Sequence, residues 1–166
     1  MSYKNLLKKI IQISTIITCS FVLSYSSFAA GGGGDDKKSK GAKSNYYYNA
    51  VKLINKKSYE AAIDNLFKAE KNSKNDADIY NYLGFSYRKI GNLEKAAFYY
   101  EKALKISPKH KGALEYQGEM FLTQGNLELA EVNLKKLSKI CFLGCKEEKM
   151  LKESIKKYNK GQKSSY

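Results

Sequence analysis

Residues 77–108 constrain the fold of this 166-residue chain more than any other stretch. Counting from Tyr80, small or apolar residues follow at the third, fourth and seventh places, which is the spacing of one face of an α-helix. The pair Gly91-Asn92 then interrupts the pattern with residues typical of a turn. A second helical pattern follows and ends just before Pro108. Two amphipathic helices joined by a tight turn cannot bury their apolar faces alone, so the stretch predicts an array of helical hairpins.

Residue by residue, this hairpin resembles the tetratricopeptide repeat (TPR) family. The family pattern has Trp, Leu, Gly and Tyr in the first helix, then Ala, a large apolar residue, Ala and Pro. The matching residues here, with Tyr in place of Trp, are Tyr80, Leu83, Gly84, Tyr87, Ala96, Tyr100, Ala103 and Pro108. The small residues Gly84 and Ala96 would let the paired helices approach closely, while the tyrosine rings fill the space around them.

The family's period of 34 residues places two further copies in register with the first. The turn Gly91-Asn92-Leu93-Glu94 maps forward onto Gly125-Asn126-Leu127-Glu128. The small residues of the pattern map onto Gly118 and Ala50, Ala130 and Ala62, and Leu137 and Ala69. The sequence therefore predicts three repeats at 43–76, 77–110 and 111–144, of which the first diverges most, as terminal repeats usually do.

The resemblance implies an all-α fold, a right-handed α-solenoid of three TPR-like hairpins with a C-terminal capping helix. Helices are expected at Asn45–Asn55, Ser58–Lys71, Asp76–Ile90, Leu93–Ile106, Lys109–Gln124, Leu127–Lys139 and Glu148–Tyr158. The capping segment, 145–160, carries a narrow apolar stripe of Met150, Leu151, Ile155 and Tyr158, suited to sealing the last hairpin. Residues 161–166 are expected to be a frayed tail.

The N-terminal 29 residues read as a signal peptide rather than as part of the fold. Three lysines among the first nine residues precede an uncharged apolar run, Ile10–Leu23. Ser27 and Ala29 are small residues at the two positions that a signal peptidase recognises before its cleavage site. We expect export to the periplasm or cell envelope of a bacterium; a retained membrane anchor is the alternative. Residues 30–44 are rich in glycine and lysine and are expected to form a flexible tether.

The net charge of +14 comes from lysines spread over helix surfaces and tails. Arg88 is the only arginine, whereas proteins that read nucleic acids favour arginine for bidentate contacts. We therefore expect no nucleic-acid partner and interpret the lysines as solvated faces. An association with an anionic partner or envelope surface is the alternative.

Cys141 and Cys145 are the two cysteines beyond the signal segment. Export implies an oxidising compartment, and an even number of cysteines without other partners points to one local disulfide, with Gly144 allowing the turn. Two free thiols are the alternative. A metal site is not expected, because two cysteines are too few for a closed zinc site. The placement also looks like that in short secreted bacterial TPR proteins that end in a cysteine-containing turn and a last helix.

No catalytic constellation can be assembled from this sequence. His110 is the only histidine, and its place at a helix start favours an exposed or capping role. Phosphate-binding and dinucleotide motifs are missing, and the pair Glu147-Glu148 reads as solvated charge. We expect neither enzymatic activity nor a cofactor.

The resemblance implies that the first helix of each hairpin lines a concave groove. The residues at the inward-facing places are Tyr47, Tyr48, Val51, Asn81, Tyr82, Phe85, Arg88, Lys89, Tyr116 and Glu119. Tyr48, Tyr82 and Tyr116 recur at the repeat period and predict an aromatic ladder for an extended apolar or proline-rich segment, with Asn81 able to bond its backbone. The carboxylate clamp of some family members is not matched. Packing between helices is the alternative role of these tyrosines.

These observations predict an exported protein-interaction module, an adaptor or scaffold, whose partner is a protein or peptide. Two alternatives remain open at this point: a structural subunit of a cell-envelope complex, and a lysine-rich binder of the anionic envelope surface.

Overall fold

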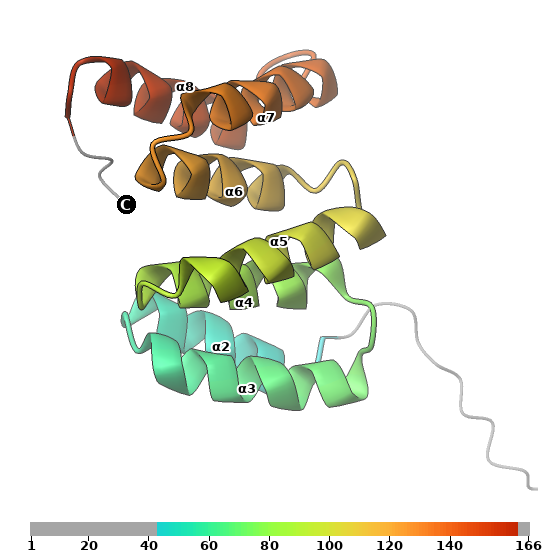
Figure 1. Cartoon of the computed structure of the whole chain (residues 1–166). Coiled ribbons are helices and arrows are strands. Elements are labelled where there is room, and N and C mark those ends of the chain that lie inside the picture. Colours follow the sequence, from blue (N-terminus) through green and yellow to red (C-terminus); the bar gives the residue numbers. More distant parts are fainter. Residues whose placement is uncertain (1–42, 163–166) are drawn as a thin grey trace, which may run out of the picture. The chain divides into compact units, whose positions relative to one another are not determined.

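The computed structural model describes residues 43–162, which form seven α-helices and no strand in that range (Figure 1). Their bounds are α2 Asn45–Asn55, α3 Tyr59–Asn72, α4 Ala77–Lys89, α5 Leu93–Ile106, α6 Lys111–Thr123, α7 Leu127–Ile140 and α8 Lys146–Asn159. The expected signal peptide, nearly all of the tether and the last four residues lie outside the described range. No helix within the described range is both long and apolar enough to cross a membrane.

The helices pack as three consecutive hairpins, α2–α3, α4–α5 and α6–α7. Adjacent hairpins meet through α3–α4 and α5–α6, and the first helices also contact one another, α2 with α4 and α4 with α6. Each hairpin thus packs on its neighbours in the sequence, as repeat architectures require. This arrangement confirms the predicted all-α, TPR-like solenoid.

The turns inside the hairpins depend on a left-handed backbone residue. Gly91 and Gly125 end α4 and α6 with φ of +83° and +77°. The asparagine that follows each glycine caps the next helix, since its side chain accepts a hydrogen bond from the backbone N–H three residues on, at 3.0 and 3.1 Å. The first hairpin makes the same turn with Lys57 at φ +61°. The divergence of the first repeat is therefore local, and its turn geometry is kept.

Close approach of helices explains two of the glycines. A Cβ atom on Gly84 would lie 2.7 Å from the ring of Tyr100, which is itself fully buried. A Cβ atom on Gly118 would lie 2.7 Å from the side chain of Leu151 in α8. Both distances are far below ordinary van der Waals contact, so a larger residue at either position would force the neighbouring side chain to move.

The cap helix α8 packs on both α6 and α7. Leu151, Ser154 and Ile155 are its buried residues, while Met150 and Tyr158 are partly buried, so the predicted apolar stripe faces the last hairpin. The helix begins two residues earlier than expected, because Cys145 stands in extended backbone as its N-cap. Four of its five lysines are exposed, and Lys157 is partly buried.

Three predicted helix starts, Ser58, Asp76 and Lys109, were one or two residues early, and side-chain capping explains the last two. Asp76 and His110 lie just outside α4 and α6 as N-caps. The carboxylate of Asp76 accepts from the N–H of Asp78 at 3.0 Å, and Nδ1 of His110 accepts from the N–H of Ala113 at 3.0 Å. These side chains satisfy backbone donors that the helix itself leaves unpaired.

Candidate binding face

The first helices, α2, α4 and α6, bring residues from three repeats onto one face. Because α4 contacts both α2 and α6, side chains at corresponding repeat positions lie near one another on adjacent helices. This is the face to which the predicted binding residues belong.

Aromatic rings run across this face from α2 to α6. The rings of Tyr47 and Tyr82 lie 5.8 Å apart between centroids, and those of Phe85 and Tyr116 lie 4.7 Å apart. Tyr48 meets Tyr47 edge-on at 5.6 Å. We refer to these five residues as the aromatic row. Such tilted and edge-on ring pairs contribute about 0.5–1.5 kcal/mol each beyond their burial.

The predicted ladder of Tyr48, Tyr82 and Tyr116 is therefore interleaved with two further rings. The ring pairs between helices run through Tyr47 and Phe85, which the sequence places at neighbouring positions of the pattern. Periodicity finds residues at equivalent positions, whereas contact between helices depends on how far each side chain reaches. The row is denser in aromatic surface than the 34-residue spacing alone indicates.

The row is partly open to solvent. Tyr48 is 52% exposed, and the other four members are partly buried, as is the neighbouring Val51. Each partly buried ring therefore packs against the array and still presents surface. Burial, followed by the nearby Tyr82, raises the pKa of Tyr47 above its usual value, and the hydroxyl can donate a hydrogen bond.

Two lysines lie over the rings. Lys43 Nζ is 4.8 Å from the centroid of Tyr47, and Lys89 Nζ is 6.0 Å from that of Phe85. Burial lowers the pKa of Lys89, and the positive charges of Arg88 and Lys57 lower it further. The face thus combines aromatic surface with cations at its margin, where cation–π attraction holds the ammonium groups.

Three of the predicted binding residues are buried rather than displayed. Asn81, Arg88 and Glu119 are 5%, 7% and 0% exposed, and Glu115 beside them is 1% exposed. We refer to these four residues as the buried polar layer. Burial, followed by the negative charge of Glu119, raises the pKa of Glu115 to about 8, while Arg88 opposes the shift. The binding role predicted for this set stays a prediction, and the surface available for it is that of the aromatic row, Val51 and Lys89.

A small ion-pair network joins the starts of the first helices. Lys43 Nζ lies 2.6 Å from Asp76 Oδ1 and 2.8 Å from Asp78 Oδ2. Because Nδ1 of His110 accepts from the backbone, its Nε2 carries the hydrogen and donates to Asp78 Oδ1 at 2.9 Å. The hydrogen bond from His110 and the contact with Lys43 hold the pKa of Asp78 below its usual range, against the effect of burial. His110 is therefore a capping residue that also links α6 to α4.

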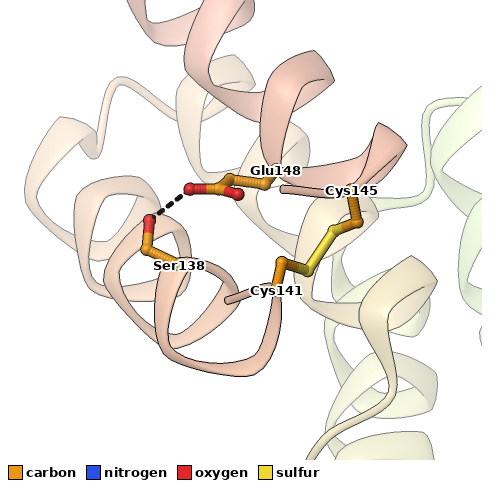
Figure 2. The surroundings of a disulfide bond; sticks show 4 residues. All are labelled: Ser138, Cys141, Cys145 and Glu148. Carbon is orange, nitrogen blue, oxygen red and sulfur yellow. Dashed lines mark hydrogen bonds between the residues drawn. A yellow bond between two sulfur atoms is a disulfide. The ribbon is translucent and has the colours of Figure 1, made fainter. Parts of the chain in front are cut away.

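Beyond this face, the end of α7 and the start of α8 are joined by a disulfide between Cys141 and Cys145, whose Cα atoms lie 5.5 Å apart (Figure 2). A carboxylate oxygen of Glu148 lies within 4.8 Å of the two sulfur atoms. The sequence analysis interprets this glutamate as solvated charge. Its position three residues after Cys145, on the first turn of a helix, is a signal that could have predicted its place near the cysteines.

Two open hollows lie elsewhere on the surface. One, of about 560 Å³, lies between α7 and α8 against Leu134 and Ile155. The other, of about 520 Å³, lies beside Phe67, Tyr80 and Lys102. Neither hollow is lined by a residue of the aromatic row, so the row is an exposed strip of surface outside both of them.

Comparison with known proteins places residues 77–110 in the sequence profile described as "Tetratricopeptide repeat". These are the bounds predicted for the middle repeat. The chain is also 35% identical over 91 residues to a protein of Guillardia theta described as "Uncharacterized protein ycf37". That match covers 52% of this chain and 51% of the relative, so the chain spans about half the length of the protein it matches.

Proposed function

We propose that this protein, whose residues 77–110 are a tetratricopeptide repeat, is an exported adaptor that binds an extended protein segment along its aromatic row. Tetratricopeptide repeats are protein–protein interaction modules and are typically non-catalytic, which supports the general part of this proposal. The single observation that carries the specific part is the set of partly exposed rings on α2, α4 and α6, which pair from helix to helix.

The chemistry of the row suits an extended partner. Tyrosine and phenylalanine offer large apolar faces at little cost in side-chain entropy, and tyrosine adds a hydroxyl for the partner's backbone. An extended apolar or proline-rich segment presents alternating side chains and an unpaired backbone to such a strip. Lys89 lies at the margin of the row, so an acidic residue beside the apolar anchors would add to the affinity.

The experiment uses peptides selected from a displayed random library on the full chain, followed by measurement of their affinity in solution. Tyr48→Ala and Tyr82→Ala are expected to weaken the selected peptides by about 1–3 kcal/mol each, the range of an interface anchor. Phe98→Ala is the matched control, because Phe98 is an aromatic residue that is 59% exposed on α5, outside the row.

Circular dichroism separates binding from folding in these variants. Tyr48 is half exposed, so its truncation should leave the helical signal unchanged. The row would not be the binding surface if the peptides bound the Tyr48 and Tyr82 variants as tightly as they bind the parent. The same conclusion would follow if the Phe98 variant lost as much affinity as the Tyr48 and Tyr82 variants.

Export is the second part of the proposal, and it is supported by the charged start, apolar run and small residues of positions 1–29. N-terminal sequencing of the protein purified from an envelope fraction should begin at Ala30. Recovery of a mature chain that starts at Met1 in the cytoplasm would contradict export.

One observation favours a second candidate function, association with an anionic membrane surface. Phe142 and Leu143, in the loop closed by the disulfide, are 92% and 93% exposed. Lys139, Lys146 and Lys149, exposed on the flanking turns, surround the loop with positive charge. Exposed apolar side chains beside lysines suit a bilayer with anionic headgroups. Each apolar side chain that inserts would contribute about 1.5–3 kcal/mol to the free energy of binding, and each lysine about 1 kcal/mol.

The chain has no tryptophan, so Phe142→Trp would introduce a single fluorescent reporter at the tip of this loop. Its emission should shift to shorter wavelength with vesicles of phosphatidylglycerol, and salt should reverse the shift. Val132→Trp, at a partly exposed site on α7, is the control and should not respond. An unchanged emission of the Phe142 variant would rule this candidate out.

A further inference from the structure

The disulfide and one carboxylate form a compact group of potential metal ligands. The sulfur atoms of Cys141 and Cys145 and a carboxylate oxygen of Glu148 all lie within 4.8 Å of one another. Figure 2 shows Glu148, on the first turn of α8, directing its carboxylate toward Ser138 of α7 beside the disulfide. Donors bind a zinc ion at about 2.0–2.3 Å, so donors that share one ion lie roughly 3–4 Å apart. After reduction the two sulfurs, bonded to each other in this structure, would separate and the carboxylate would turn to reach such distances.

Packing holds these three residues in place independently of the disulfide. Leu137, one turn before Cys141, and Leu151, one turn beyond Glu148, are both 0% exposed. Leu151 fits against Gly118 of α6, so α8 is seated by its own core contacts. Breaking the sulfur–sulfur bond therefore leaves the two thiols and the carboxylate on the same two helix ends.

A second contact orients the carboxylate. Ser138 Oγ, in the last turn of α7, donates a hydrogen bond to Glu148 Oε1 at 2.6 Å (Figure 2). The other carboxylate oxygen keeps its lone pairs for another partner. Outer hydrogen bonds of this kind are typical of metal-binding carboxylates, because they fix the ligand before the ion arrives.

We propose that the reduced form of this protein binds one zinc ion through Cys141, Cys145 and Glu148. A dithiol reductant would exchange with the disulfide, becoming a disulfide itself and leaving two thiols on the protein. Binding of Zn²⁺ to the two sulfurs then releases both thiol protons to solvent. Two thiolates and one carboxylate give a mixed sulfur and oxygen set with a fourth position open to water or to a partner's side chain.

The charge around the group suits this chemistry. Zinc with two thiolates and one carboxylate carries a net charge of about −1. Lys146 and Lys149 on α8 and Lys139 on α7 are exposed nearby and compensate it. In this arrangement the metal replaces the disulfide as the cross-link between α7 and α8, so the cap can be fastened in either redox state.

The test measures zinc binding by the full chain, before and after reduction with a phosphine in the absence of oxygen, by competition with a coloured zinc chelator. The reduced protein should bind one zinc ion per chain, and the oxidised protein none. Cobalt(II) added to the reduced protein should give the thiolate charge-transfer absorption and the intense visible bands of a tetrahedral site.

Two adjacent glutamates provide a matched pair of variants. Glu148→Gln should weaken zinc binding at least tenfold, whereas Glu147→Gln, which removes the same charge one residue away, should not. Cys141→Ser should abolish the cobalt spectrum. Circular dichroism of each reduced variant reports whether the helices persist.

Several outcomes would overturn the proposal. A reduced protein that binds no zinc, whether folded or unfolded, excludes the site. Equal affinities of the Glu147 and Glu148 variants would show that the carboxylate is not a ligand, and that the thiols alone account for the binding.

Discussion

Lys57 occupies the turn of the first hairpin with a φ of +61°, where the other two hairpins have glycine. The left-handed conformation costs a residue with a Cβ atom about 1–2 kcal/mol. We predict that Lys57→Gly stabilises the protein by about 1 kcal/mol, measured by urea unfolding. Lys56→Gly is the control, because Lys56 has a negative φ of −87°. A gain that is equal in the two variants would point to charge rather than to backbone strain.

Gly84 is predicted to tolerate no larger side chain. Leucine there would push against the buried ring of Tyr100, which a single Cβ atom already meets at 2.7 Å. Overpacking of this kind costs roughly 1–3 kcal/mol or more, so Gly84→Leu should lower the melting temperature clearly. Gly112→Ala is the milder comparison, because its Cβ atom would approach its nearest neighbours, the side chains of Asn81 and His110, only to 3.3 Å and beyond. Equal melting temperatures for the parent and the Gly84 variant would contradict the close packing of α4 on α5.

For single residues, the sequence identifies the constrained positions more reliably than it identifies the residues that contact them. Gly84 and Tyr100 stand out through the repeat pattern, and the structure brings them together. Gly118 stands out equally, yet it meets Leu151 of the cap helix, which lies outside the repeat period. A periodic pattern contains the contacts that recur, whereas a contact with a terminal element occurs once and leaves no repeat in the sequence.

Between α4 and α6, the buried polar layer makes stability depend on pH. The pKa of Glu115 is raised by burial to about 8, from an ordinary value of 4.5. The folded state therefore holds the proton more tightly than the unfolded state, and the stabilising contribution of neutral Glu115 is lost as pH rises through about 8. Arg88, Glu119 and the α8 residues Lys146 and Glu147 are the charges that act on it.

We predict that the free energy of unfolding falls between pH 5 and pH 8 by up to about 1 kcal/mol per pH unit. Glu115→Gln should flatten this dependence, because glutamine does not titrate. Glu101→Gln, at an exposed site on α5, should leave the slope unchanged. Asp78 acts in the opposite sense and at lower pH. Because its pKa is lowered in the folded state, ionised Asp78 stabilises the fold at pH values above its ordinary pKa, and this stabilisation is lost in acid. Identical slopes for the parent and the Glu115 variant would exclude Glu115 as the cause.

The elements themselves follow from the sequence almost completely, while the exposure of their polar residues does not. Helices α2 and α5 have the predicted bounds. Helices α4 and α6 begin later than predicted, where Asp76 and His110 act as caps, and each ends one residue earlier. The inward-facing positions, however, include a partly exposed aromatic row and a buried polar layer. Position within one helix cannot separate the two, because burial of Asn81 or Glu119 is decided by the neighbouring helices.

Across the described part of the chain, the apolar core forms two clusters. One contains Ala50, Leu66 and Tyr100 and belongs mainly to the first two hairpins. The other contains Leu114, Leu137 and Leu151 and belongs to the last hairpin with α8. In a repeat array each unit is stabilised mainly by its neighbours, so the two ends should open separately.

We therefore predict that one core substitution loosens one end of the array. Leu151→Ala should cost about 2–5 kcal/mol and speed hydrogen exchange in α6, α7 and α8, leaving α2 and α3 protected. Leu66→Ala, an equally buried leucine in the first cluster, is the mirror control and should loosen α2 and α3 while sparing α8. Hydrogen-exchange mass spectrometry resolves the two patterns. Leu104 and Phe121 pack against both clusters, so α5 and the end of α6 should respond to either change. Uniform loss of protection in both variants would mean that the array unfolds as one cooperative unit, and that α8 secures the whole fold rather than its last hairpin.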